Sequence, residues 1–326
     1  MKFIDENQEE RSSLIINRRT FLYSCLSAAS LVSCKTKSVE SVEPVVEWSV
    51  ACFGDSLTAG AGGTPYPALL QYYFKTYSIT NYGVGGQRAQ EIAVRQGGIP
   101  IYMSIEGEAF NGLNNIKITS LSNQFLTAPN DTQTETKQGT LNGIACIVTR
   151  TATLSSNNEQ LESYVVRPID SSIAAIPADS IFIPEEAEKS KSKIQILWMG
   201  RNDVPILDDV AEIIDQCVEY INTPRRFVII GILNALSQIK GTDEYDIIKN
   251  FNDALAVKYS DHYVAATPPT EEEMDFMHYA PSEYDLIDIE NGTFPRGMHA
   301  DDIHLNTYGY QLIANRVADS FYKNSY

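Results

Sequence analysis

Two parts of the chain show strands that alternate with helices. Nearly continuous apolar runs occupy residues 45–53, 194–199 and 227–233, and runs of this length are typical of strands buried in a parallel sheet. A further strand is predicted over 78–82. Apolar residues at helical spacing predict helices over 67–77, 88–96, 207–221, 245–259 and 307–322. Because alternating strands and helices form parallel sheets, the predicted fold class is α/β.

The region between residues 99 and 192 interrupts this alternation. It is rich in Thr, Ser and Asn, and short alternating runs occur at 115–119 and 144–151. Such runs predict strands with one buried face, and a structureless loop of this length is improbable inside a compact domain. We therefore predict a small β-rich subdomain over 99–192, inserted into an α/β domain made of residues 45–98 and 193–326.

Residues 1–34 have the pattern of an export signal. Arg18-Arg19-Thr20-Phe21-Leu22 precedes an apolar stretch, and Leu31-Val32-Ser33-Cys34 resembles a bacterial lipoprotein cleavage site. The apolar stretch is shorter than the roughly 20 residues that span a bilayer. A retained transmembrane helix and a buried N-terminal helix are the alternatives. We predict an exported lipoprotein, anchored to a membrane on its periplasmic or cell-surface side through lipid on Cys34, with a tether over 35–44.

Composition makes several other classes of function improbable. Asp and Glu number 42 against 25 Lys and Arg, for a net charge of −17, whereas nucleic-acid binding needs clustered basic residues. We therefore expect no nucleic-acid partner. Cys52, Cys146 and Cys217 are widely spaced and show no disulfide framework. With four histidines and no CxxC pair the usual spacing of zinc ligands is missing, so we expect no metal.

Ser56, Asp301 and His304 have the chemistry of a catalytic triad. Ser56 directly follows the first predicted strand in Phe53-Gly54-Asp55-Ser56, and open parallel sheets bind ligands at the carboxyl ends of their strands. Serine is a poor nucleophile until a base takes its proton. In Asp301-Asp302-Ile303-His304 the spacing lets the Asp301 carboxylate orient the imidazole. Each piece alone is weak, because such a serine can be a helix cap and a D-x-x-H pair can cap a helix or bind a metal.

Two further segments offer hydrogen-bond donors for the oxyanion of acyl transfer. The glycines of Asn81-Tyr82-Gly83-Val84-Gly85-Gly86-Gln87 allow a tight turn with exposed N–H groups, and Gly86 is a candidate donor. The residues alone leave open which glycine donates. Asn202, in Gly200-Arg201-Asn202-Asp203, follows a predicted strand and would bring a neutral amide to the same crevice. A flexible turn and a helix cap are the plain alternatives for the two segments.

These four segments together resemble the SGNH or GDSL-type hydrolases. The ordered blocks of that family are found as Gly54-Asp55-Ser56-Leu57, Gly86, Gly200-x-Asn202-Asp203 and Asp301-x-x-His304. The resemblance covers roughly residues 48–98 and 193–322. It implies a flavodoxin-like αβα sandwich, ester hydrolysis without a cofactor, and an oxyanion hole formed by the Ser56 N–H, the Gly86 N–H and the Asn202 side chain.

The leading functional hypothesis is hydrolysis of an oxygen ester, such as an acetyl group on a carbohydrate, through an acyl-Ser56 intermediate. A small-molecule or glycan ester is thus the expected partner, together with the membrane. The alternatives are an acyltransferase that acts on a sugar hydroxyl and an inactive lipid-anchored glycan-binding protein. The insertion could roof the active site, bind glycan, or only stabilise the catalytic unit. The sequence carries no signal for the oligomeric state.

Other segments are assigned no role in the chemistry. His299 is a rival base in principle, but Asp301 lies after it and the block pattern selects His304. His262 and His278 have no acidic partner in a motif. Residues 267–293, with Pro268-Pro269 and an acidic run, are predicted to form a long loop or lid.

Overall fold

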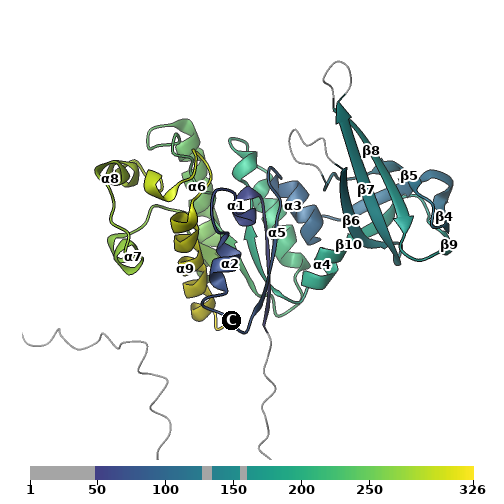
Figure 1. Cartoon of the computed structure of the whole chain (residues 1–326), viewed down its shortest axis with the longest axis horizontal. Coiled ribbons are helices and arrows are strands. Elements are labelled where there is room, and N and C mark those ends of the chain that lie inside the picture. Colours follow the sequence, from purple (N-terminus) through teal and green to yellow (C-terminus); the bar gives the residue numbers. More distant parts are fainter. Residues whose placement is uncertain (1–47, 127–133, 155–159) are drawn as a thin grey trace, which may run out of the picture. The chain divides into compact units, whose positions relative to one another are not determined.

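A parallel sheet lies at the centre of the part that the computed structural model describes, residues 48–126, 134–154 and 160–326 (Figure 1). Its five strands run in the order β13-β12-β11-β1-β2. They are β1 (Ser49–Gly54), β2 (Ser78–Gly83), β11 (Ile194–Trp198), β12 (Phe227–Ile230) and β13 (Tyr263–Val264). The chain moves outward from β1 to β2 and then returns to β11 on the other side of β1. The carboxyl ends of β1 and β11 therefore flank the switch point at which open sheets bind ligands.

Helices pack on both faces of this sheet. Successive side chains of a strand point to opposite faces, so Val50 and Cys52 lie in one apolar cluster, and Ala51 and Phe53 in another. The first cluster includes residues of α2 (Tyr66–Leu70) and α9 (Thr307–Lys323). The second includes residues of α3 (Ala89–Gln96), α5 (Val210–Tyr220) and α6 (Asp243–Tyr259). The predicted α/β class is confirmed.

An antiparallel barrel lies between α3 and β11 in the sequence (Figure 1). The described residues close it in the order β10-β3-β5-β8-β7-β6. The strands are β3 (Ile101–Ile105), β5 (Ile116–Leu121), β6 (Thr134–Leu141), β7 (Ile144–Leu154), β8 (Gln160–Pro168) and β10 (Ser180–Pro184). Closure pairs every edge strand, and Met103, Val148 and Phe182 are among the residues that fill the interior. Beside it β4 (Ala109–Gly112) pairs with β9 (Ser172–Ala175), and α4 (Glu185–Ser190) follows.

The segment 267–293 is not the long loop that its prolines suggested. It contains two helices, α7 (Glu271–Phe276) and α8 (Glu283–Glu290). Each begins with a capping box, in which the hydroxyl of Thr270 or Ser282 accepts a backbone N–H of the first turn. Reciprocal bonds of this kind satisfy N–H groups that the helix itself leaves unpaired. The acidic run that indicated a solvated loop supplies the first turns of these helices instead, where negative charge is favourable.

The remaining sequence predictions concern the N-terminal segment, the cysteines and one helix. The export signal over 1–34, Cys34 and the tether over 35–44 lie outside the described residues. Among the described helices none is long and apolar enough to cross a bilayer. Cys52, Cys146 and Cys217 are buried and unpaired. The predicted helix over 67–77 is shorter than expected, because α2 ends at Leu70 and turns follow it.

Candidate active site

Ser56 stands where β1 ends and the short helix α1 (Ser56–Ala59) begins. The Asp55 carboxylate caps this helix by accepting the Leu57 N–H at 2.9 Å. Asp55 is buried, and the burial raises the pKa of its carboxyl to about 7. Gly54 is required by close packing, since a Cβ there would lie 2.1 Å from the Thr58 hydroxyl and 2.4 Å from the Trp198 carbonyl oxygen. The tight junction between strand and helix fixes Ser56 at the carboxyl edge of the sheet.

Asp301 and His304 lie in a short loop that leads into α9. A bridge between His299 and Leu305 closes this loop. One carboxylate oxygen of Asp301 accepts the Ile303 N–H at 2.8 Å and the His304 N–H at 2.7 Å. The three-residue spacing therefore brings Asp301 next to His304 by a tight turn, and no helix is involved. It leaves the second carboxylate oxygen free for the imidazole.

The structure brings Ser56, His304 and Asp301 together in one hydrogen-bonded relay. The second Asp301 oxygen is 2.7 Å from His304 Nδ1, and His304 Nε2 is 2.9 Å from Ser56 Oγ. Burial alone would raise the pKa of Asp301, but hydrogen bonds from the His304 N–H, its ring and the Ile303 N–H lower it to about 2. An ionised carboxylate can only accept hydrogen bonds, so Nδ1 carries the proton of the neutral ring and Nε2 remains an acceptor. His304 can therefore take the Ser56 proton.

The other histidines lie in different surroundings. His299 is buried against Phe294, and neither ring nitrogen has a hydrogen-bond partner among the described residues. Burial lowers its pKa. His262 is stacked on Phe227, with its Nδ1 3.1 Å from the Tyr326 hydroxyl. His278 is exposed. Of the four, His304 is the one that contacts Ser56.

The two loops with the candidate oxyanion donors are joined to each other. Gly86 has a φ of 77°, a conformation that favours glycine. A Cβ on its neighbour Gly85 would lie 3.8 Å from the Ser56 Cβ, which places this loop beside the serine. Asn202 Nδ2 donates to the Gln87 carbonyl oxygen at 2.9 Å. An amide nitrogen has two hydrogens, so Asn202 retains a second one to donate.

Gln87 and Arg95 form a buried polar network that sequence reasoning missed. Arg95 Nε donates to the Gln87 side-chain oxygen at 2.7 Å, and its Nη1 donates to the Tyr82 carbonyl oxygen at 3.0 Å. Gln87 Nε2 in turn donates to the Phe125 carbonyl oxygen at 3.1 Å. Gln87 is thus held by its side chain while its backbone oxygen orients Asn202. The sequence does contain a signal for this network. Arg95 lies beside the apolar positions of the predicted helix over 88–96, and a charged residue at such a position needs polar partners.

The same network reaches the barrel. Arg95 lies 3.9 Å from Glu186 at the start of α4, and Glu186 accepts from Lys137 of β6 at 2.6 Å. Arg95 is only 1% exposed, and burial lowers its pKa to about 10. A buried charge is costly unless it is paired and hydrogen-bonded. The inserted barrel therefore contributes to the surroundings of the loop that carries Gly86.

Comparison with known proteins places this geometry in a family. The family model described as GDSL-like lipase/acylhydrolase matches residues 50–317. The chain belongs to this family. The match extends across the barrel as well as the α/β core, and it shows that this GDSL-family protein is a hydrolase of the esterase or lipase type.

Solved structures similar to this chain also exist. This GDSL-family chain is similar to a member of the lipolytic protein G-D-S-L family from Veillonella parvula DSM 2008, with 15% sequence identity and a TM-score of 0.41. The alignment covers 85% of this chain and 99% of that one. No curated protein matches the chain.

Proposed function

We propose that the protein is a serine esterase that hydrolyses an oxygen ester through an acyl-Ser56 intermediate. The observation that carries the proposal is the relay from Ser56 Oγ through His304 to Asp301, with distances of 2.9 Å and 2.7 Å. Catalytic nucleophiles are expected to lie within hydrogen-bond reach of a base that a third group orients. We therefore assign Ser56 as nucleophile, His304 as general base and acid, and Asp301 as the group that orients the imidazole.

The first chemical step forms the acyl-enzyme. Ser56 Oγ attacks the ester carbonyl carbon while His304 Nε2 takes the hydroxyl proton, and the carbonyl electron pair moves onto its oxygen. The Ser56 N–H, the Gly86 N–H and the Asn202 amide are proposed to stabilise that oxyanion. The intermediate then collapses. The bond to the alcohol oxygen breaks, and His304 returns the proton to the departing alcohol.

The second step releases the acid. His304 takes a proton from a water molecule, whose oxygen attacks the acyl carbon, and the bond to Ser56 Oγ then breaks as the proton returns to the serine. Asp301 stabilises the imidazolium each time it forms, and its low pKa keeps the carboxylate ionised. Both steps use only groups of the chain and water. We propose accordingly that no metal and no cofactor takes part.

The proposed substrate is an ester of a carbohydrate, with an acetyl group as the simplest acyl part. An acyltransferase would use the same relay but pass the acyl group to a sugar hydroxyl. The two are separated by incubating the full chain with p-nitrophenyl acetate and excess sugar acceptor. Hydrolysis predicts as much free acetate as p-nitrophenol, whereas a shortfall matched by acetylated sugar would identify a transferase. No turnover would contradict both and favour a binding protein.

The core is proposed to be a flavodoxin-like αβα sandwich with an inserted domain. What supports this is the strand order, which reads 2-1-3-4-5 when the parallel strands are numbered along the chain. The proposed division is an α/β domain over 45–98 and 193–326 and an insertion over 99–192. The barrel strands between Ile101 and Pro184 support the limits of the insertion.

We also propose that the protein is a lipoprotein anchored to a membrane through Cys34. The support is the sequence pattern around Arg18-Arg19 and Leu31-Val32-Ser33-Cys34. Replacing Cys34 with alanine should move the protein from the membrane fraction to the soluble fraction, because lipid attachment needs the thiol. Fractionation beside a Cys52→Ala control tests this. Continued membrane retention of the Cys34 variant would show that the lipoprotein proposal is wrong.

A further inference from the structure

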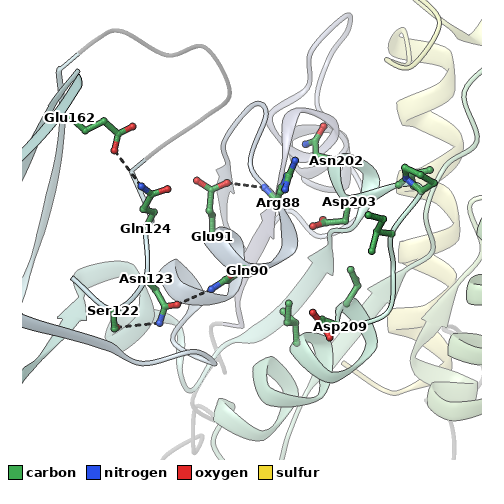
Figure 2. A pocket seen from close by; sticks show the side chains of 15 residues that line it. Arg88, Gln90, Glu91, Ser122, Asn123, Gln124, Glu162, Asn202, Asp203 and Asp209 are labelled. Atoms are coloured by element: carbon green, nitrogen blue, oxygen red, sulfur yellow. Dashed lines mark hydrogen bonds between the residues drawn. The ribbon is translucent and has the colours of Figure 1, made fainter. Parts of the chain in front are cut away.

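A cavity of about 700 Å³ lies between the α/β core and the inserted barrel (Figure 2). One wall comes from α3 and the residues before it, including Arg88, Gln90 and Glu91. The opposite wall comes from the barrel, through residues 122–124 and Glu162 of β8. A third side is formed by residues 202–206 and the start of α5. The volume lies within the range of small-molecule sites.

The cavity borders the proposed oxyanion hole. Asn202 lines it directly. Arg88, another lining residue, follows Gly86 by two positions. Asp203 holds these two sides together, because its carboxylate accepts the Ala89 N–H at 2.9 Å. Ser56, Gly86 and His304 are not among its described lining residues, so the cavity adjoins the proposed catalytic residues through Asn202 and Arg88. A part of a bound ester that extends past Asn202 would reach it.

The lining is suited to hydroxyl groups. Amide side chains are found on both walls, and Gln90 Nε2 of the core donates to Asn123 Oδ1 of the barrel side at 2.8 Å (Figure 2). Gln124 and Ser122 add further donors and acceptors on the barrel side. Side chains that both donate and accept match sugar hydroxyls, which do the same. Val204, Pro205 and Ile206 add an apolar strip that fits the C–H groups of such a ligand.

The charge of the lining disfavours anions. Of the lining residues that the structure describes, four are acidic (Glu91, Glu162, Asp203 and Asp209) and one, Arg88, is basic. Glu162 is paired with the buried Arg150 at 2.8 Å. Even with this pair set aside, the acidic residues of the described lining outnumber Arg88. A carboxylate or sulfate on a ligand would meet like charges at short range.

We propose that this cavity is a subsite for an uncharged, hydroxyl-rich part of the substrate, and that the barrel contributes its outer wall. The inference rests on the proposed esterase function. The hydroxyl-rich part can belong to the alcohol, as in an acetylated neutral sugar, or to a hydroxylated acyl group. The insertion is then a specificity element of the active site.

The test compares kcat/KM of the full chain and its Gln124→Ala variant on three esters. Gln124 is exposed and donates to Glu162 through a long 3.5 Å bond, whereas the Asn123 amide already donates to the Pro100 carbonyl oxygen and the Ser122 hydroxyl. The three esters are p-nitrophenyl acetate, an acetylated neutral xylo-oligosaccharide and methyl glycerate. Losing one hydrogen-bonding side chain should lower kcat/KM for a hydroxyl-rich ester by about tenfold more than for p-nitrophenyl acetate. A selective loss on the xylo-oligosaccharide assigns the cavity to the alcohol part, and a selective loss on methyl glycerate assigns it to the acyl part. The matched control is Gln138→Ala, an exposed glutamine of the same insertion that is not among the described lining residues of the cavity.

The charge of the ligand is tested with an acetylated galacturonate oligosaccharide. The wild type should prefer the neutral ester by about tenfold. Asp209→Asn should reduce that preference, because it removes one negative charge from the lining. The fold should be kept, since asparagine also suits the N-cap position of α5 that Asp209 occupies. Equal losses on all esters in Gln124→Ala, or a wild-type preference for the acidic ester, would overturn the subsite proposal. Absence of Ser56-dependent turnover of p-nitrophenyl acetate would instead remove the esterase function, so the two failures are distinguishable.

Discussion

Replacing Ser56 with alanine is expected to lower kcat for p-nitrophenyl acetate by about 10⁶-fold, the order found when a triad serine is removed. Alanine has no oxygen to attack the carbonyl, so the acyl-enzyme cannot form. The hydroxyl has one described partner, His304 Nε2, and the helix cap comes from Asp55. The melting temperature should therefore change little. Kinetics and thermal unfolding of both proteins measure the two quantities.

A matched control for this variant is Ser78→Ala. Ser78 is exposed at the start of β2 and lies outside every block of the family. It should retain wild-type turnover. A Ser56→Ala enzyme that keeps more than about a tenth of the wild-type rate, with its fold intact, would exclude Ser56 as nucleophile. Residual activity above the uncatalysed rate is expected, because the oxyanion donors remain.

Replacing His304 with glutamine is expected to have an effect nearly as large, about 10⁶-fold in kcat. Glutamine can fill part of the space but cannot exchange protons near neutral pH, so neither the serine nor the water is activated. Residues that act as one unit have strongly non-additive effects. The Ser56→Ala/His304→Gln double variant should therefore be no slower than either single variant. Steady-state rates of the four proteins complete this cycle.

The exposed His278 supplies the control for the second variant. His278→Gln removes an imidazole without touching Ser56 and should leave kcat unchanged. If the two single effects multiplied in the double variant, Ser56 and His304 would act independently, which the 2.9 Å contact between them does not predict. Retained activity in His304→Gln combined with loss in His299→Gln would transfer the role to the buried histidine.

The elements nearest the site were the most predictable from sequence. The strands that end at Gly54 and Trp198 are continuous apolar runs, and a run of this kind can be recognised in the sequence before its neighbours in the sheet are known. Asp301 and His304 lie three residues apart, so a local turn suffices to pair them. The approach of His304 to Ser56, 248 positions away, is non-local. The chemistry of the three residues suggests this contact, and the resemblance of the ordered blocks to a family in which such residues meet makes the prediction specific.

Non-local features were missed for physical reasons. Closure of the barrel depends on β10 pairing with both β3 and β6, which no local pattern specifies. The role of Arg95 depends on Gln87, Tyr82 and Glu186, which tertiary contacts alone bring together. The helices α7 and α8 are a local exception, because their signal is the capping-box spacing of Thr270 with Glu273 and of Ser282 with Asp285, which the prolines and the acidic run of this segment do not indicate. The cavity between the α/β core and the barrel is non-local as well, because its walls come from α3 and from the barrel side.

The central claim, that Ser56 carries the acyl group, is tested most directly by mass spectrometry of the acid-quenched enzyme during turnover of p-nitrophenyl acetate. The account predicts that the peptide containing Ser56 gains the mass of one acetyl group in the wild type and gains nothing in Ser56→Ala. Acetyl on a different residue, or an adduct that persists in the Ser56→Ala enzyme while turnover continues, would contradict it.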